Sequence, residues 1–260
     1  MDIFNAAPDP FGGMVVSGED LPEDSGVFAV QLASALADWR RNGVKVVWLT
    51  IPRLRASLIP AAVAAGFVFH HAREDSLLLT LALVQGAHVP PFATHYVGAG
   101  GVVLREDGQI LVVSERYKLL PGRRLKLPGG ALQAGEHIGD AVVREVKEET
   151  GVDARFEAVV CLRHWHGYRY GKSDIYFVCR LAPLTTELDP DPEEIAECLW
   201  MPHGEFLSDP EVHPFNKRIV RAALESAGLS REFLDNYGTG ESHELLFPEK
   251  IPAAEGRGRG

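Results

Sequence analysis

Three glutamates stand close together near the middle of the chain, in a segment whose residue types favour a helix. Glu145, Glu148 and Glu149 occupy positions i, i+3 and i+4. Val142 and Val146 form an apolar stripe beside them. On a helix this spacing places the three carboxylates along one edge, where like charges repel and destabilise the helix unless something neutralises them. Divalent Mg²⁺ or Mn²⁺ is the obvious partner, because both ions prefer carboxylate oxygens.

An ordinary solvated surface would also explain a fragment of this kind. Arg144 lies four residues before Glu148, within reach to orient that carboxylate, and we include Arg144 among the candidate catalytic residues. Charge pairs at this spacing are also common on exposed helix faces. The fragment alone therefore does not separate a metal site from a charged helix surface.

A longer pattern surrounds the glutamates and separates the two interpretations. It runs G-x5-E-x7-R-E-U-x-E-E-x-G-U, where U is an apolar residue. Its fixed places are filled by Gly130, Glu136, Arg144, Glu145, Val146, Glu148, Glu149, Gly151 and Val152. This sequence resembles the Nudix box and departs from it at no fixed place. The resemblance implies a Nudix hydrolase, which uses Mg²⁺ or Mn²⁺ to split a diphosphate joining a nucleoside to another group.

The resemblance also implies roles for individual residues. Glu145, Glu148 and Glu149 match the family's metal-binding catalytic carboxylates. Glu136 matches a supporting or outer metal ligand, and the backbone carbonyl of Gly129 is the implied further ligand. These roles make physical sense, because glycine lets the backbone approach a pyrophosphate without a Cβ clash. Metal ions that bridge phosphate oxygens also lower the pKa of the attacking water.

The resemblance covers most of the chain and implies the fold. The stretches IPRLRASLIPAAVAAGFVFHHA, ATHYVGAGGVVL, GKSDIYFVCRL and EEIAECLWM resemble Nudix proteins that carry an N-terminal pre-Nudix domain. We therefore expect an α/β protein: a Nudix α/β/α sandwich with a mixed sheet, preceded by a small α/β domain similar in fold to an acetyltransferase. Residues 1–90 lack a glycine-rich acyl-CoA loop, so no transferase activity is expected. Leu125 stands where the resembling proteins commonly place a Trp in the wall of the site.

The same group suggests a substrate. It includes plant ADP-ribose and NADH pyrophosphatases and a vertebrate protein encoded antisense to a fibroblast growth factor, so ADP-ribose or NADH is the expected substrate. The box itself does not choose, and a nucleoside triphosphate or an RNA cap is the alternative within this enzyme class. A non-catalytic module that senses nucleotides or binds proteins is an alternative of another class. Such Nudix-fold proteins typically lack box glutamates, and all are present here.

A carboxylate from outside the box is expected as a general base or an additional metal ligand. The segment LDPDPEEIAECLW offers Glu193, Glu194 and Glu197 just before the last predicted strand. Glu194 falls where related proteins place such an acid, so we select it as a candidate catalytic residue. The same residues could equally form a solvated acidic loop.

Basic and aromatic residues interleave over residues 163–174, in an otherwise acidic protein. Such a run can stack a nucleobase and hold a phosphate or ribose, and it can equally be a plain hairpin loop or part of a dimer contact. From this run we select Arg163, Lys172 and Asp174 as candidate substrate-binding residues. A second set of phosphate-binding candidates precedes the LPGG segment and comprises Arg116, Arg123, Arg124 and Lys126.

The surrounding patterns predict two domains and a tail. The first domain is expected over residues 1–90, the Nudix hydrolase domain over 94–235 and a disordered tail over 236–260, with a proline-containing linker at 85–94. Helices are expected at 28–39 and 53–65, over the box glutamates, and at 215–227. Strands are expected at 44–51, 67–70, 77–83, 96–104, 110–113, 156–162, 175–181 and 199–201. Strands 96–104 and 110–113 are expected to pair as a hairpin.

The first predicted helix is apolar enough to suggest self-association. Phe28, Leu32, Leu36 and Trp39 recur at helical spacing, and Gly43 ends the helix. Because such a stripe can pack against more than one small sheet, we expect the first domain to support a homodimer.

Composition limits the remaining possibilities. The 260 residues include 46% hydrophobic and 24% charged residues, as in ordinary globular proteins, and the net charge is −10. This acidic balance argues against stable nucleic-acid binding, so the expected partner is a nucleotide-derived small molecule. No membrane span and no signal peptide are recognised. The three cysteines form no short-spaced pair, and the expected location is the cytoplasm.

Overall fold

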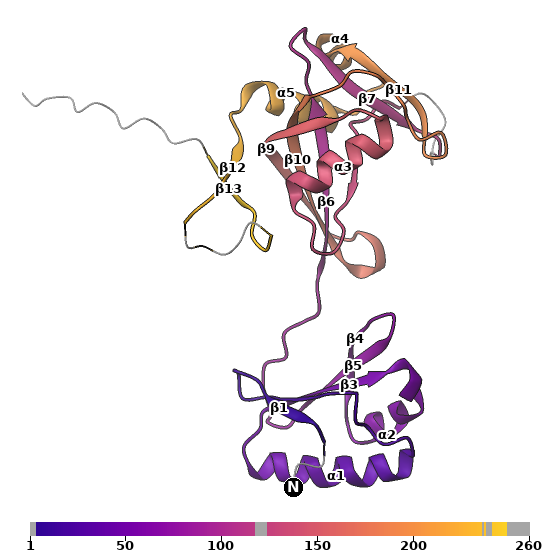
Figure 1. The fold of residues 1–260 in the computed structure, drawn as a ribbon, viewed down its shortest axis with the longest axis vertical. Helices are drawn as coiled ribbons and strands as arrows, with labels where there is room; N and C mark the ends of the chain where they lie inside the picture. Colours follow the sequence, from indigo (N-terminus) through magenta and orange to yellow (C-terminus); the bar gives the residue numbers. More distant parts are fainter. Residues whose placement is uncertain (1–3, 118–123, 236, 238–240, 249–260) are drawn as a thin grey trace, which may run out of the picture. The chain divides into compact units, whose positions relative to one another are not determined.

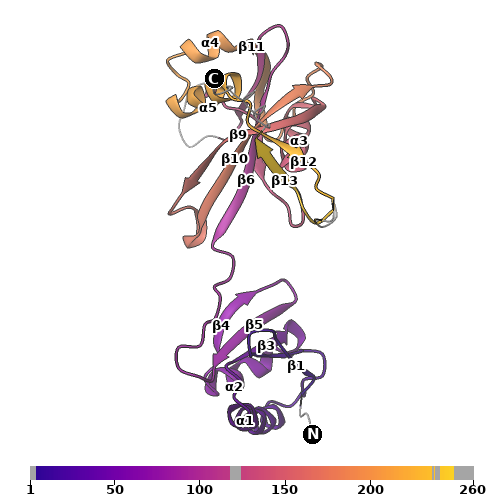
Figure 2. The same cartoon turned by 90° about the vertical axis from the view of Figure 1, so that its left-hand side faces the viewer.

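The structure is a computed structural model of the chain and describes residues 4–117, 124–235, 237 and 241–248. The chain divides into two compact units, Met1–Thr94 and His95–Gly260 (Figures 1 and 2). Each unit has its own sheet and its own apolar core. All of the predicted metal-binding residues lie in the second unit.

The N-terminal unit is built on a five-stranded sheet in the order β1-β2-β3-β5-β4. Strands β2 and β3 are parallel, and the other neighbouring strands are antiparallel. The elements are β1 (Ala6–Pro8), β2 (Met14–Val16), α1 (Ser25–Arg41), β3 (Val46–Pro52), the 3₁₀ helix η1 (Arg53–Leu58), α2 (Ile59–Ala64), β4 (Val68–Ala72) and β5 (Ser76–Ala82). The helix predicted over residues 53–65 is thus divided into η1 and α2, with Pro60 in the first turn of α2.

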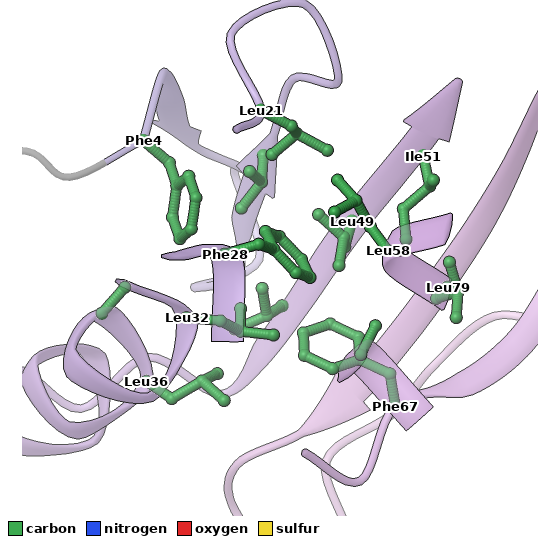
Figure 3. Close-up of a cluster of buried hydrophobic side chains, with 14 residues drawn as sticks. Phe4, Leu21, Phe28, Leu32, Leu36, Leu49, Ile51, Leu58, Phe67 and Leu79 are labelled. Carbon is green, nitrogen blue, oxygen red and sulfur yellow. The ribbon is translucent and has the colours of Figure 1, made fainter. Parts of the chain in front are cut away.

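The apolar stripe of α1 is buried in the core of its own unit. Asp24 caps the helix by accepting a hydrogen bond from the Val27 N–H at 2.8 Å. Phe28 and Leu32 are fully buried and share a core with Leu49 of β3 (Figure 3). Because the stripe is used inside the unit, the predicted homodimer loses the physical basis on which it was inferred.

The C-terminal unit contains a six-stranded sheet, in the order β13-β12-β9-β10-β6-β8, and a two-stranded sheet of β11 and β7. Its strands are β6 (His95–Val103), β7 (Gln109–Glu115), β8 (Gly129–Ala131), β9 (Ala154–Trp165), β10 (Ser173–Pro183), β11 (Ile195–Pro202), β12 (Leu229–Glu232) and β13 (Leu245–Pro248). Its helices are α3 (Ile138–Thr150), the 3₁₀ helix η2 (Arg169–Gly171), α4 (His203–Ser208) and α5 (Pro214–Glu225). Strand β10 runs parallel to β6 and antiparallel to β9, so the sheet is mixed.

Helices cover both faces of the six-stranded sheet (Figure 2). On one face, Val142 and Val146 of α3 lie directly over Gly101 of β6. On the other face, Ile219 and Val220 of α5 belong to a second buried cluster. The expected α/β/α sandwich with a mixed sheet is therefore confirmed.

The hairpin predicted between residues 96–104 and 110–113 is wrong. Strand β7 pairs antiparallel with β11, and an isolated bridge from Leu104 to Ile110 is its contact with the end of β6. Both edges of β6 are already occupied, because β10 pairs with one edge and β8 with the other. The predicted turn does form, with the Gly108 N–H donating to the Arg105 carbonyl, but it leads into the separate two-stranded sheet.

Part of the predicted disordered tail is ordered. Strand β13 pairs antiparallel with β12, and Leu246 packs against the core beneath α3. The prediction of disorder fails for residues 241–248 because the apolar run from Leu245 to Phe247 supplies a strand. Residues 236, 238–240 and 249–260 of the predicted tail lie outside the described residues.

The three cysteines all lie within the described residues. Cys161, Cys179 and Cys198 are all free thiols. Burial raises the pKa of the Cys179 thiol, which keeps it protonated and unreactive.

Among the residues that the structure describes, no helix has the length and apolar character needed to cross a bilayer.

Candidate active site

Helix α3 presents the predicted metal-binding glutamates beside the short strand β8. Its inner face, with Val142 and Val146, is fully buried and fixes the helix against the sheet. Glu145 therefore reaches Gly130, where an added Cβ would lie 2.5 Å from its Oε2 atom. The carboxylate of Glu148 stands on the outer side, and 58% of its side chain is exposed. The predicted edge of carboxylates is thus formed, with one member in solvent.

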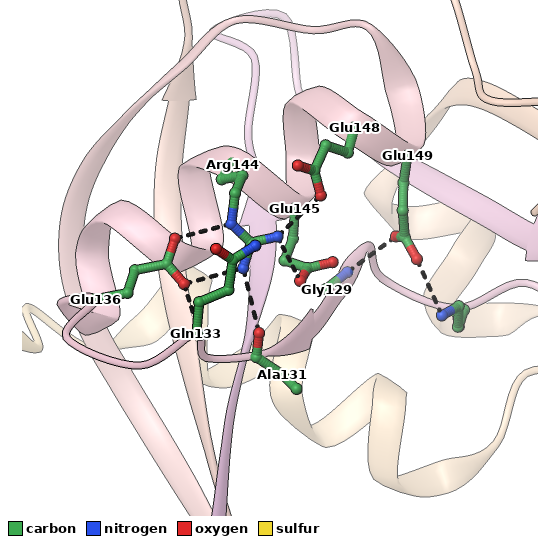
Figure 4. A network of polar contacts seen from close by, with 9 residues as sticks. Gly129, Ala131, Gln133, Glu136, Arg144, Glu145, Glu148 and Glu149 are labelled. Atoms are coloured by element: carbon green, nitrogen blue, oxygen red, sulfur yellow. Dashed lines mark hydrogen bonds and ion pairs between the residues drawn. The ribbon is translucent and has the colours of Figure 1, made fainter. Parts of the chain in front are cut away.

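The guanidinium of Arg144 lies among three of the glutamates (Figure 4). Its Nε and Nη2 atoms donate to the two carboxylate oxygens of Glu136 at 2.8 and 2.9 Å, a forked pair. Its Nη1 atom donates to Glu145 and to Glu148, both at 2.8 Å. The hydrogen bonds that Arg144 donates to Glu136 lower the pKa of Glu136 and raise the pKa of Arg144. Arg144 therefore offsets one of the negative charges at the acidic edge, the row of Glu145, Glu148 and Glu149 on α3.

Glu149 has a different set of partners. It is 6% exposed and accepts a hydrogen bond from the Gly129 N–H at 2.9 Å. Lys126 lies 3.5 Å from Glu149 and 2.6 Å from Glu115. Burial raises the pKa of Glu149, and the charge of Lys126 partly opposes that effect. Burial alone would lower the pKa of Lys126, but the charges of Glu149 and Glu115 outweigh it and raise that pKa.

Gly129 makes the close approach of backbone and carboxylate possible. Its φ of +148° is one that other residues rarely adopt, and an added Cβ would lie 2.5 Å from the Gly100 Cα atom. Its N–H donates a hydrogen bond to Glu149, which places the Gly129 backbone next to one of the predicted metal-binding carboxylates. The sequence-based choice of Gly129 as a backbone ligand is compatible with this placement.

The chemistry of these donors fits a hard divalent cation, which takes oxygen ligands. Glu145, Glu148, Glu149 and the Gly129 carbonyl would hold it, with Glu136 in support. As placed, however, the described residues contain no group of three or more His, Cys, Asp or Glu side chains that could hold an ion. In this arrangement Arg144 contacts the carboxylates of Glu136, Glu145 and Glu148 (Figure 4). Binding an ion therefore requires these carboxylates to exchange contacts with Arg144 for contacts with the metal.

A cavity of about 190 Å³ lies next to this cluster, on the α5 side of the sheet. Its lining includes Gly100, Lys126, Arg163, Tyr176, Phe215 and Asn216. Lys126 belongs both to the cavity and to the ion pair with Glu149, so the two features are continuous. A group bound in the cavity would lie beside the acidic edge.

Arg163 is held in the cavity wall by an ion pair and by aromatic rings. Its Nη2 atom donates to the buried carboxylate of Asp174 at 2.7 Å. Its guanidinium lies 5.3 Å from the ring centre of Trp165, 5.4 Å from that of Tyr176 and 5.8 Å from that of Phe215. Its buried Nε atom has no hydrogen-bond partner among the described residues. An unpaired buried donor is costly, so this atom is a natural contact for a bound ligand.

Tyr176 reaches from the cavity to the acidic edge. Its ring lies over Gly98 and Gly100, where any added Cβ would collide with it. Burial raises the pKa of its phenol, which therefore stays neutral. The alternating glycines of β6 are the sequence signal that predicts room for a large side chain on the neighbouring strand.

The structure brings together some of the predicted residues and separates others. Lys126, Arg163 and Asp174 lie at or beside the cavity. Lys172 lies instead at the far end of the β9–β10 hairpin, with its ammonium 5.2 Å from the ring centre of Tyr96. Arg124 is exposed, and Arg123 lies outside the described residues.

Glu194 and Arg116 are joined to each other through the backbone. The Arg116 N–H donates to the Glu194 carbonyl at 2.8 Å, and both residues are exposed. The described contacts do not include one between the Glu194 carboxylate and the glutamates of α3, so its catalytic role stays a prediction. Glu115, which pairs with Lys126, was missed by sequence reasoning, as were Phe215 and Asn216 of the cavity. Glu115 comes from β7 and the other two from α5, and no local motif joins these elements to the box.

Comparisons with known proteins identify the family of the chain. A family model described as the NUDIX domain matches residues 94–223, and one described as the Nudix hydrolase domain matches residues 4–83. The chain is 40% identical to Nudix hydrolase 8 of Arabidopsis thaliana over 94% of this chain and 69% of that protein. It is 39% identical to human nucleoside diphosphate-linked moiety X motif 6, over 83% of this chain and 70% of that protein.

A solved NUDIX hydrolase from Nitrosomonas europaea aligns with a TM-score of 0.42 and 24% identity, over 49% of this chain and 86% of its own. The likeness of the N-terminal unit to an acetyltransferase stays a prediction. The matched domain and the identities to full-length relatives are sufficient to place the chain: it belongs to the Nudix hydrolase family and is a pyrophosphohydrolase of nucleotide-derived small molecules.

Proposed function

We propose that the enzyme uses Mg²⁺ or Mn²⁺ to hydrolyse the diphosphate of ADP-ribose or NADH. The observation that carries this proposal is the continuity of the acidic edge of α3 with a cavity that contains two cations, Lys126 and Arg163. An acidic edge that holds metal ions suits the diphosphate, and a cavity with aromatic and cationic walls suits an attached nucleoside.

The residues of the chain divide the work between these two parts. Glu145, Glu148 and Glu149 would hold the cation, and Glu136 keeps Arg144 in position beside them. Lys126 forms ion pairs with Glu115 and Glu149, and its positive charge would offset that of a diphosphate bound beside them. A bound Mg²⁺ or Mn²⁺ neutralises phosphate oxygens and lowers the pKa of the attacking water.

The cavity supplies the recognition of the organic part. Tyr176 and Phe215 offer aromatic surfaces, and the unpaired Nε of Arg163 offers a hydrogen-bond donor. The amide of Asn216 both donates and accepts hydrogen bonds, which suits the polar edge of a base or the hydroxyls of a ribose. A volume of about 190 Å³ accommodates one end of a dinucleotide, so the remainder of the substrate would extend outside.

A product assay tests the proposal and separates the alternatives. The protein is incubated with Mg²⁺ or Mn²⁺ and a panel of ADP-ribose, NADH, nucleoside triphosphates and capped RNA, and products are separated by chromatography. Release of AMP from ADP-ribose or NADH is expected, whereas release of pyrophosphate would identify a triphosphatase. Silence on the whole panel, together with nucleotide binding by calorimetry, would favour a sensing module instead.

The matched variant for this assay is Glu148→Gln. The substitution removes one metal-binding charge but keeps the shape of an exposed side chain. We expect a loss of several orders of magnitude in kcat with an unchanged circular dichroism spectrum. Unaltered turnover would show that the glutamates of α3 do not take part in the reaction.

The location in the cytoplasm is a separate proposal, which cell fractionation tests.

A further inference from the structure

A carboxylate from the end of the described chain caps the helix that carries the box glutamates. Helix α3 begins after His137, whose side chain makes no capping hydrogen bond among the described residues. Glu244 supplies the cap instead, because its Oε2 accepts the Ile138 N–H at 2.8 Å and its Oε1 accepts the Gly139 N–H at 3.1 Å. Two backbone donors that the helix leaves unpaired are thereby satisfied, and a negative charge lies at the positive end of the helix.

Arg231 fixes Glu244 in this position. Its Nη2 atom donates to Glu244 Oε1 at 2.6 Å, and its Nε atom donates to the same oxygen at 3.1 Å. The same Nη2 atom donates to Asp140, in the first turn of α3, at 3.0 Å. Arg231 lies in β12 and Glu244 directly precedes β13, so the β12–β13 hairpin contacts the start of the helix from both of its sides.

Arg231 and Glu244, together called the clamp below, pack closely against the start of α3. The Glu244 side chain is 6% exposed, and the Arg231 guanidinium lies over the Phe156 ring at 5.5 Å. At Gly139 an added Cβ would lie 2.5 Å from Arg231 Nη2 and 3.0 Å from Glu244 Oε1. The first turn of α3 therefore carries a residue without a side chain at the place where the hairpin approaches.

The clamped turn leads directly to the acidic edge. Glu136 lies two residues before Ile138, and both of its carboxylate oxygens hold Arg144. Arg144 in turn binds Glu145 and Glu148. If the first turn frays, Glu136 moves, and the forked contact that aligns Arg144 with the other carboxylates is lost.

We infer that Glu244 is a positioning residue of the active site, which acts through the first turn of α3 to set the carboxylates that bind metal. The part of this inference that concerns metal rests on the proposed function. Neither Arg231 nor Glu244 lines the cavity, so we expect their contacts to act on the acidic edge and to leave the recognition of the organic part unchanged.

The test compares Glu244→Ala with Glu244→Gln in the full chain. Glutamine keeps an oxygen that accepts an N–H bond, whereas alanine removes the cap entirely. Glu241→Ala, an exposed position in the same loop, is the matched control. Each variant is studied at a temperature where circular dichroism shows it folded. Four quantities are measured: Mn²⁺ affinity by electron paramagnetic resonance, kcat and KM at saturating Mn²⁺, and amide hydrogen exchange over residues 138–149.

For Glu244→Ala we expect a loss of Mn²⁺ affinity and of kcat of about tenfold each, because removal of an outer-shell partner of a metal site typically has effects of this size. The KM for substrate should stay within about twofold, since recognition lies elsewhere. Amide exchange should accelerate through residue 149 as well as in the first turn. Glu244→Gln should recover only part of each loss, because it keeps one accepting oxygen and loses the other. Glu241→Ala should match the unaltered chain.

Two results overturn the inference. One is a folded Glu244→Ala variant with lower thermal stability but unaltered Mn²⁺ affinity and kcat, which would make the cap purely structural. The other is faster exchange confined to residues 138–141. If the unaltered chain itself binds no Mn²⁺, the proposed function fails, and the exchange at residues 144–149 still decides whether Glu244 positions this part of the helix.

Discussion

The hydroxyl oxygen of Tyr176 lies so close to Gly129 that a Cβ on residue 129 would stand 2.6 Å from it. Tyr176 lines the cavity, whereas Gly129 donates its N–H to Glu149. Through this contact, Tyr176 and Gly129 connect the cavity, where an organic group would bind, with helix α3, which carries the carboxylates. Because burial raises the pKa of Tyr176, its neutral phenol can donate a hydrogen bond at this junction.

Replacing Gly129 with alanine should therefore lower activity by more than the loss of backbone freedom at this residue explains. The new Cβ would collide with the backbone of Ala99 and Gly100 as well as with Tyr176. We expect Gly129→Ala to lower kcat/KM by at least about a hundredfold, because displaced catalytic groups have effects of this size. Gly135→Ala is the control, since Gly135 also has a positive φ, of +81°, but has open space around it. Equal losses in both variants would contradict the role of the close contact.

Arg144 should stabilise the metal-free protein more than the metal-loaded one. In Arg144→Met, three carboxylates lose their shared cation, and we expect unfolding free energy to fall by about 2–4 kcal/mol without metal. Millimolar Mg²⁺ should narrow the difference, because the ion takes over the neutralisation. Thermal unfolding with and without Mg²⁺ checks this, and Lys147→Met on the exposed face is the control. An identical deficit in both conditions would argue against an ion at these carboxylates.

Filling the cavity should affect binding of the substrate rather than chemistry. Asn216→Phe places a larger side chain into a space of about 190 Å³, away from the glutamates of α3. We expect KM to rise about tenfold or more while kcat changes little, the pattern for loss of uniform binding. Steady-state kinetics with the substrate found in the product assay measures both values. Arg221→Ala, an exposed change on the same helix, should leave them unaltered.

Acid should weaken a loop of the N-terminal unit through Asp9. The carboxylate accepts hydrogen bonds from the Gly13 and Phe11 N–H groups and from the Trp48 indole, and the Gly13 bond contributes most to lowering its pKa below 3.8. A lowered carboxyl pKa favours the folded state above the unfolded-state pKa, and this contribution is lost as pH falls through the folded-state value.

In nuclear magnetic resonance spectra, the chemical shift of the Trp48 indole proton should therefore follow the ionisation of Asp9, with a midpoint below 3.8. Asp9→Asn should show a smaller loss of stability between pH 7 and pH 3 than the unaltered chain. A midpoint at or above the ordinary value would show that these hydrogen bonds do not act on the ionised form.

Local patterns predicted the parts of the fold that short stretches of sequence determine. The stripe of α1, the β-branched run of β3 and the box helix α3 were each recognisable from their own residues. The partner of β7 was not, because the choice between β6 and β11 depends on β8 and β10 occupying the edges of β6 first. Strand β13 was hidden for a similar reason, since its pairing partner β12 lies on the other side of a polar loop.

The site shows the same division. The box glutamates could be named from the resemblance to the Nudix box, and the structure places Glu149 beside Gly129 and Glu145 beside Gly130. Glu115 and Asn216 could not, because each reaches the site from an element far from the box in sequence. Arg144 was expected to orient Glu148, but its forked contact with Glu136 depends on how the loop before α3 folds back.

The position of the β12–β13 hairpin has a practical consequence for anyone expressing the catalytic half alone. The NUDIX domain match ends at residue 223, before either strand of the hairpin begins. A fragment trimmed at that boundary keeps every residue of the signature yet loses both Arg231 and Glu244. Weak metal uptake by such a fragment would then reflect where it was cut, and extending it through Pro248 would restore the native helix start.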